Sequence, residues 1–317
     1  MKTSTSKRLR WNVAIWLAAG LFMTSTAGMA SGPIMPDPKA EARHQPQVEE
    51  TANGIPLVNI TAPSSGGVSR NEYETFNVPD KGAILNNSYT LSKTELAGYV
   101  PGNNNMAERP AKIIVNEVTG TGSTSMDGFL EVAGNRADVV IANPNGITVN
   151  GGGFINTGKA FLTTGKPVYD GEDHLQRFDI TGGDILIEGK GLGGKETESL
   201  AILSRAVKIN AGIWAEDLHI TTGANTVDAK TLEASAIEGK GGRPAFALDT
   251  AAIGGMYAGR ITLVGTEKGL GVNNSGTWSA EDNLTLDWNG DLKNSGTIYS
   301  KGNTDLRASR LENDKTI

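Results

Sequence analysis

The sequence predicts an all-β protein whose chain coils into a parallel solenoid. Three observations indicate this fold class: a high glycine content, a long succession of short strand patterns, and a repeat near the carboxyl end. Glycine makes up 41 of 317 residues, about twice its usual share, and cysteine is absent. Glycine destabilises helix interiors, while disulfides and thiolate metal sites need cysteine. The composition therefore excludes a disulfide scaffold and disfavours a helical bundle, whereas repeating strands and turns fit it.

Residues 1–30 have the pattern of a secretory signal peptide. The basic stretch MKTSTSKRLR precedes the apolar run VAIWLAAGLFM, and small residues follow up to Ala30. The apolar run is too short to span a bilayer comfortably, so we expect cleavage after Ala30 and export of the mature chain. An uncleaved membrane anchor is the alternative, and it is disfavoured because charges flank the run on one side only.

The net charge argues against nucleic acid as a partner. The whole chain carries −6, and the leader holds four basic residues and no acid, so the mature chain carries −6 − 4 = −10. Binding to phosphates requires a basic stripe, which so acidic a chain lacks. We therefore expect no nucleic-acid binding and no docking on anionic lipid.

Two kinds of sequence follow the leader. Residues 31–52 combine scattered prolines with charges and show no apolar spacing, which predicts a flexible lead. From Asn53 onward the chain consists of short apolar runs bounded by Gly, Asn, Asp or Pro, such as KIIVNEV, ADVVIANP and RITLVG. These are strand patterns separated by turns. Residues 195–211 fit either one helix or the two strands LAILS and AVKI, and the scarcity of other helical patterns favours the strands.

A repeat of 20 residues is visible near the carboxyl end. The sequence NSGT at residues 274–277 recurs at residues 294–297. So short a unit cannot fold alone, so each repeat must be one turn of a coil whose apolar side is covered by its neighbours. If residues 53–310 all form such turns, the solenoid has about 13 of them. The repeats in residues 273–317 are expected to be cut short at Ile317.

From Asp127 the sequence reads DGFLEVAGNRADVVIANPNGITVNGGGFINTGKAFLTTGKP. The segments NGIPLVNITAPSSGGVSRNEYETFNV and SLAILSRAVKINAGIWAEDLHITTGANTV lie upstream and downstream of it. Together they resemble the amino-terminal secretion domain of two-partner secretion exoproteins. This family includes filamentous haemagglutinins, large haemolysins and contact-dependent growth inhibition toxins. The resemblance assigns residues 53–272 to that domain and implies that residues 273–317 begin a haemagglutinin-type repeat region.

The resemblance implies a fold, a partner and a location. The fold is a right-handed parallel β-helix with an amino-terminal β cap and extra-helical hairpins. The partner is a cognate outer-membrane β-barrel transporter, which recognises the domain in the periplasm. The protein is then expected to be secreted to the surface of a Gram-negative bacterium. Host or neighbouring-cell surfaces are further possible partners, through regions beyond this sequence.

The family carries two Asn-Pro-Asn signatures, and one of them is intact here. It comprises Asn143, Pro144, Asn145 and Gly146, between the strand patterns DVVIA and ITV. Proline fixes φ at the second position of a turn, asparagine can bond the backbone ahead of it, and glycine completes the turn without a steric penalty. The signature therefore predicts a tight corner. Whether it only shapes the corner or also contacts the transporter is left open by the residues.

The other signature departs from the family pattern. Asn103 and Asn105 occupy the outer positions, but Asn104 stands where the family has proline. Without the proline, the resemblance assigns no strong role to a rigid turn at residues 103–106, although both outer asparagines persist. The candidate secretion motif consists of Asn143, Pro144, Asn145, Gly146, Asn103 and Asn105.

Little in the sequence points to chemistry. The three histidines, His44, His174 and His219, are not at metal-ligand spacing, and no Gly-x-Ser-x-Gly nucleophile elbow is present. The stretch GFINTGK has the spacing of a phosphate loop but lacks the following Ser or Thr and a helix pattern. The acids at 170–174 and 280–283 are explained as solvated turns. We expect no catalytic residues, no cofactor and no metal site.

Two functions from different classes remain. The favoured one is the secretion module of a surface adhesin, haemagglutinin or contact-dependent toxin, which is not an enzyme. The alternative is a secreted carbohydrate-active β-helix enzyme, because acids on adjacent turns can be brought together.

Overall fold

The computed structural model describes residues 32–106 and 109–317. The predicted signal peptide, residues 1–30, lies outside the described residues. Gly32–Ile317 forms one unit that is built almost wholly from β-strands. No helix among the described residues is long and apolar enough to cross a membrane.

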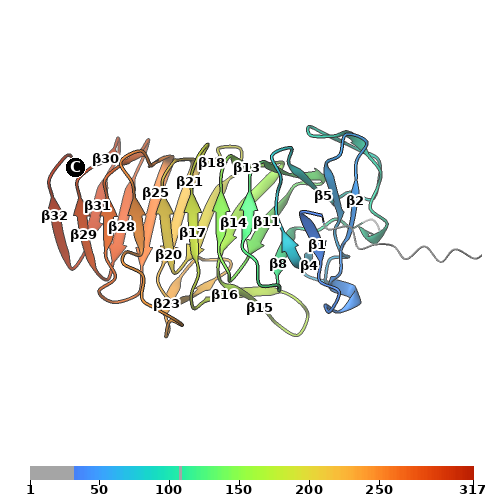
Figure 1. Ribbon diagram of the computed structural model, residues 1–317, viewed down its shortest axis with the longest axis horizontal. Helices are drawn as coiled ribbons and strands as arrows, with labels where there is room; N and C mark the ends of the chain where they lie inside the picture. Colours follow the sequence, from blue (N-terminus) through green and yellow to red (C-terminus); the bar gives the residue numbers. More distant parts are fainter. Residues whose placement is uncertain (1–31, 107–108) are drawn as a thin grey trace, which may run out of the picture. The chain divides into compact units, whose positions relative to one another are not determined.

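The strands of this unit stack into a parallel β-helix with three faces, which confirms the predicted fold class. Figure 1 shows the successive turns side by side, from β8 in cyan to β32 in red. Neighbouring turns pair in parallel register, with Ile202 opposite Ile220 and Ile220 opposite Leu263. Each inner strand therefore obtains its backbone hydrogen bonds from the turns before and after it.

The strands are grouped here by face. The first face contains β3 (Pro56–Asn59), β5 (Ala83–Asn87), β10 (Phe129–Gly134), β13 (Gly152–Ile155), β18 (Leu192–Gly194), β27 (Thr277–Ala280) and β30 (Thr297–Ser300). The second contains β4 (Val68–Phe76), β8 (Ile113–Val118), β11 (Ala137–Ala142), β14 (Thr157–Thr163), β19 (Ser199–Ser204), β28 (Leu284–Trp288) and β31 (Thr304–Arg307). The long strands β21 (Gly212–Thr222) and β25 (Gly255–Gly265) contribute to both of these faces.

The third face shows that the expected number of turns was wrong. Its eight strands are β9 (Thr124–Met126), β12 (Ile147–Val149), β17 (Asp184–Ile187), β20 (Ala206–Ile209), β24 (Leu248–Thr250), β26 (Val272–Asn274), β29 (Asp291–Asn294) and β32 (Arg310–Asn313). The estimate of about 13 turns assumed that the whole chain coils.

The 20-residue repeat itself is confirmed, because Thr277 pairs with Thr297 in adjacent turns. The two strands predicted within residues 195–211 are confirmed as β19 and β20.

Three stretches leave the coil, and they account for the missing turns. One forms the hairpin of β6 (Ser92–Thr94) and β7 (Gly98–Val100), followed by the short 3-10 helix η2 (Asn104–Met106). The other two form an outer antiparallel sheet of β15 (Lys166–Tyr169), β16 (Leu175–Ile180), β22 (Asn225–Asp228) and β23 (Ala234–Ala236). This sheet covers apolar side chains on the second face, among them Val140 and Leu203.

The expectation of a flexible lead at residues 31–52 is wrong. β1 (Ile34–Pro36) pairs antiparallel with β4, and β2 (Gln47–Glu50) pairs antiparallel with β3. The 3-10 helix η1 (Ala42–His44) lies between them in the chain. Each of these strands adds to an existing strand and needs few apolar residues, so no strand pattern is visible. We call residues 34–50 the amino-terminal segment.

Columns of apolar side chains fill the solenoid. Leu200, Leu218, Ile261 and Leu284 occupy the same place in four successive turns, and none of them is exposed to solvent. Burying a side chain of this size stabilises the fold by roughly 1.5–3 kcal/mol. Each turn thus has its apolar side covered by its neighbours, as the short repeat requires.

The repeated asparagine forms a ladder at one corner of the last turns. Asn274 Nδ2 donates to Asn294 Oδ1 at 2.8 Å, and Asn294 Nδ2 donates to Asn313 Oδ1 at 2.7 Å. Asn274 and Asn294 are fully buried. Buried amides require hydrogen-bond partners, and here the same residue type in the next turn supplies them.

Removing the central member of this ladder is expected to destabilise the carboxyl-terminal turns. Asn294→Ala takes the acceptor from Asn274 and the donor from Asn313, which lowers the free energy of unfolding by about 1–3 kcal/mol. Asn303→Ala, at an exposed position in the same turn, is the matched control and should stay near wild type. Urea unfolding followed by circular dichroism measures both, and an unchanged Asn294→Ala protein would contradict the structural role of the ladder.

Candidate functional site

The intact signature forms a tight corner between β11 and β12. Asn143 Oδ1 accepts the backbone N–H of Asn145 at 2.9 Å, and the backbone N–H of Gly146 donates to the Asn143 carbonyl at 3.1 Å. Pro144 restricts φ at the second position, and Gly146 adopts a φ of 112°, which favours glycine. Asn143 and Gly146 are buried, whereas Pro144 and Asn145 are exposed.

The asparagine amides attach this corner to an earlier loop. Asn143 Nδ2 donates to the carbonyl of Gly122 at 2.9 Å and to Oγ1 of Thr124 at 3.0 Å. Asn145 Nδ2 donates to the carbonyl of Gly120 at 2.9 Å. These bonds hold the loop that leads into β9, the strand paired with β12 in the preceding turn.

The other signature forms the same kind of turn without its proline. Asn103 Oδ1 accepts the backbone N–H of Asn105 at 3.0 Å, and the backbone N–H of Met106 donates to the Asn103 carbonyl at 3.1 Å. Both side-chain amides donate to the carbonyl of Ile60, at 2.9 Å from Asn103 and 3.1 Å from Asn105. The turn at residues 103–106 therefore forms without the proline, because the first asparagine side chain closes it.

These contacts divide each signature into a structural part and a part that can meet another molecule. The amide groups of Asn143 and Asn103 are used in bonds to the protein's own backbone, and both side chains are buried. Only Pro144 and Asn145 at one corner, and Asn104 at the other, project to solvent to a substantial degree. Two asparagines separated by one residue are a local signal for such a turn. The backbone carbonyls to which their side chains donate lie in distant loops and have no local signal.

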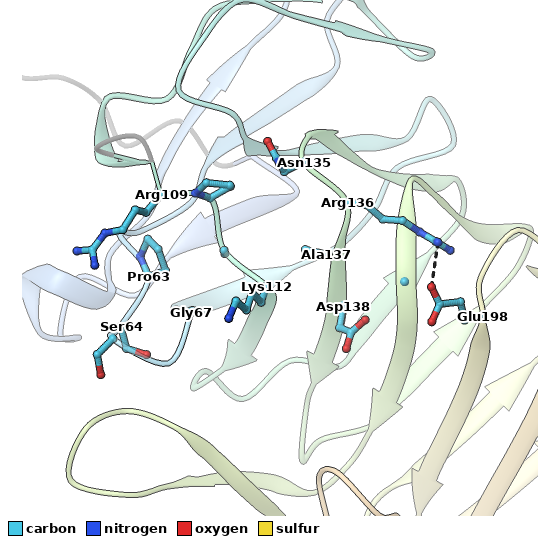
Figure 2. A pocket seen from close by; sticks show the side chains of 14 residues that line it. Pro63, Ser64, Gly67, Arg109, Lys112, Asn135, Arg136, Ala137, Asp138 and Glu198 are labelled. Carbon is cyan, nitrogen blue, oxygen red and sulfur yellow. Dashed lines mark hydrogen bonds and ion pairs between the residues drawn. The ribbon is translucent and has the colours of Figure 1, made fainter.

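An open groove of about 580 Å³ lies at the start of β11, the strand that leads to the intact corner. Its charged side chains include Arg109, Arg136, Asp138 and Glu198. Figure 2 shows Arg109 and Arg136 pointing in opposite directions, and Arg136 Nη1 contacts Glu198 Oε1 at 3.0 Å. Burial raises the pKa of the Asp138 carboxyl. The charged groups do not converge on one point, which a catalytic centre would need.

The three histidines have separate, local contacts. His44 is buried, with Nδ1 at 3.1 Å from Glu72 Oε1, and His174 Nδ1 lies 2.9 Å from Asp170 Oδ2. His219 lies on β21, where burial lowers the pKa of its imidazole. Within residues 32–106 and 109–317, no group of three or more histidine and carboxylate side chains is placed to hold a metal ion.

A buried charge cluster on β4 and β8 was missed by the sequence analysis. Arg70 Nη2 lies 2.8 Å from Glu72 Oε1 and 3.4 Å from Glu117 Oε2. Glu72 and Glu117 occupy opposite positions in the paired strands, and both are buried. Burial raises the pKa of the Glu117 carboxyl, and the nearby Arg70 charge opposes that rise. The visible signal was the presence of acids within the strand patterns RNEYE and VNEV.

The described residues thus form a parallel β-helix with an amino-terminal cap and two asparagine corners, the features that the resemblance to secretion domains implies. Comparison with known proteins agrees. The family model described as "TPS secretion domain" matches residues 33–298, a wider range than the predicted 53–272. A solved structure described as the filamentous hemagglutinin secretion domain is similar with a TM-score of 0.74 and 31% identity, over 89% of this chain and 97% of that one.

Curated relatives point to the same family. "Toxin CdiA" of Yersinia pestis is 43% identical over 298 residues, which are 87% of this chain and 9% of the relative. "16S rRNA endonuclease CdiA" of Enterobacter cloacae is 43% identical over 280 residues, 87% of this chain and 8% of the relative. The chain therefore spans less than a tenth of the length of these relatives. It belongs to the two-partner secretion (TPS) domain family, whose exoproteins cross the outer membrane of Gram-negative bacteria and are displayed at the cell surface.

Two substitutions of Asn143 test how much the intact corner stabilises the fold. Asn143→Ala removes the acceptor that closes the turn and both amide donors, so the free energy of unfolding is expected to fall by about 1–3 kcal/mol. Asn143→Asp keeps the acceptor but places a buried carboxylate against the Gly122 carbonyl, so it should lose at least as much. Urea unfolding of both proteins gives the comparison, and wild-type stability of Asn143→Ala would show that the corner does not support the fold.

Proposed function

We propose that the chain is the amino-terminal secretion module of a longer surface exoprotein, either a haemagglutinin-type adhesin or a contact-dependent toxin. Its partner is a cognate outer-membrane β-barrel transporter that recognises it in the periplasm. One observation carries the proposal: the TPS match over residues 33–298 includes both the amino-terminal segment and the stacked turns. The relatives' printed names describe toxins and nucleases, but the matched part is less than a tenth of their length.

We further propose that this module itself performs no catalysis. The carboxylates that suggested a carbohydrate-active enzyme serve local turns. Asp170 Oδ1 accepts the backbone N–H groups of Glu172 and His174, both at 2.9 Å. Glu281 pairs with Lys301 in the next turn. Glycoside hydrolysis needs two carboxylates across one bond, whereas Asp170 bonds to local backbone groups and Glu281 pairs with a lysine.

The stacked turns suit export by threading. Contacts in a solenoid join neighbouring turns, so each turn can fold as soon as the preceding one is in place. A chain that emerges amino terminus first can therefore fold outside without waiting for distant residues. In this proposal, folding on the outer side makes the transport directional.

The proposed function predicts transporter-dependent secretion. The chain with its leader should reach the medium when its cognate transporter is produced beside it, and should remain in the periplasm when the transporter is absent. Immunoblots of periplasm and medium measure the distribution. Retention in the periplasm beside a functional transporter would contradict the proposal.

We propose that the exposed part of the intact corner contacts the transporter. Pro144→Asn gives this corner the residue that the other corner carries at Asn104, so the turn should form and stability should stay near wild type. Loss of an exposed contact residue is expected to lower the secreted yield about tenfold. The matched control is Asn104→Pro, which should not reduce yield. Normal secretion of Pro144→Asn would remove Pro144 from the proposed contact.

The absence of cysteine leads to a prediction about threading. Thr262 and Thr285 lie opposite each other in adjacent turns, and both are partly exposed. Replacing both with cysteine allows a disulfide to close a loop in the oxidising periplasm before export. Secreted yield should fall and should recover with reductant, while each single variant is exported normally. Unhindered secretion of the oxidised double variant would contradict export of an unfolded chain.

A further inference from the structure

The amino-terminal segment is held at the margin of the parallel stack. β1 has β4 as its partner strand, and β2 has β3, both in antiparallel pairs. Three of the four residues of β2 are exposed, and only Val48 packs partly against the core. Strands with few apolar contacts and one partner open more readily than inner strands. The buried Ile34 and the hydrogen bond from Thr119 Oγ1 to Asp37 Oδ2, at 2.6 Å, hold the start of the segment, so η1 and β2 are the parts that depend on further contacts.

The hairpin of β15 and β16 reaches this segment from far along the chain. Figure 1 shows the hairpin loop extending beside the solenoid toward the blue amino-terminal end. Asp173 at its tip accepts a hydrogen bond from Arg43 Nη1 at 2.6 Å, between residues 130 positions apart. The same carboxylate oxygen lies 3.9 Å from His44 Nε2. One side chain of the hairpin thus contacts two residues of η1.

The hairpin tip is shaped to present this carboxylate. Asp173 has a φ of 58°, a left-handed conformation that is uncommon for residues other than glycine. Asp170 holds the conformation, because its carboxylate accepts backbone N–H groups of Glu172 and His174. The His174 ring also covers Gly66, where a Cβ atom would meet the ring at 1.9 Å. Local strain that is maintained by neighbouring bonds indicates a specific role for the tip.

A second contact joins the hairpin to the buried charges under the segment. The Arg70 guanidinium lies 4.4 Å from the centre of the Tyr169 ring on β15. Arg70 pairs with Glu72, and Glu72 in turn contacts His44. The contacts therefore form a closed circuit, from the hairpin tip through η1 and β4 and back to the hairpin. Glu72 and Glu117 are buried, so loss of Arg70 would leave buried carboxylates without their partner, whereas Arg43, which bonds to the hairpin tip, is 61% exposed.

We propose that the β15–β16 hairpin is a latch that locks the amino-terminal segment onto the solenoid, and that the segment can detach when the latch is open while the turns remain folded. Its consequence for export rests on the proposed function. The segment leaves the transporter first, but it is locked only after residues 166–180 have folded. The first strands to emerge are thus fixed only after the turns from β3 to β14 have formed.

Hydrogen exchange of the purified, folded protein tests the latch. Asp173→Asn removes the charge, and asparagine tolerates the left-handed conformation of the tip. Amide exchange across residues 34–50 is expected to become about threefold faster, because an ion pair with one exposed partner contributes little, while exchange in β25–β29 stays unchanged. Arg43→Gln should give a similar effect, and the double variant should add little to either single one, because both changes break the same contact.

The matched control is Asp179→Asn on the same hairpin. Asp179 Oδ1 pairs with Arg177 Nε at 2.8 Å within β16, and its loss should leave residues 34–50 protected. Unchanged exchange of residues 34–50 in Asp173→Asn would overturn the latch, and so would an equal rise in β25–β29, which would mean general destabilisation. Because the measurement uses folded protein without a transporter, a negative result leaves the secretion function intact.

Discussion

The backbone hydrogen bonds between successive turns are the constraint on which this structure depends. Most strands have three to six residues, too few to be stable alone, and each inner strand is satisfied only by the turns on either side. The turns pair in parallel register. This register places similar side chains one above another, in columns. The Leu200 to Leu284 column and the Asn274 to Asn313 ladder are two results of the same rule, one apolar and one polar.

The corners solve a second problem, because the chain must change direction between faces without leaving buried amides unpaired. At both family signatures an asparagine closes its own turn and attaches the turn to another segment of the chain, at Gly122 for Asn143 and at Ile60 for Asn103. Structural use of these residues does not conflict with recognition, since Pro144 and Asn145 stay exposed. The buried amides stabilise the corner, and the exposed atoms of Pro144 and Asn145 are left for the transporter contact that we propose.

Sequence reasoning predicted the fold class, the 20-residue repeat and the asparagine turn at residues 143–146, because periodicity and turn chemistry are local signals. It failed for residues 34–50, whose strands add to existing edges and need little apolar surface. It overestimated the number of turns, since nothing in a strand pattern says whether the strand coils or joins an outer sheet. The Arg70 cluster and the Asp173 contact join residues distant in the chain, and a single sequence carries no direct signal for such contacts.

The central claim is that each turn is stabilised by its neighbours. Native-state hydrogen exchange, followed turn by turn over residues 32–317, tests this claim most directly. The account predicts the strongest protection in turns covered on both sides, from β11 to β21, with protection decreasing through β29 to β32. Uniform protection along the solenoid, or the strongest protection in β31 and β32, would contradict it.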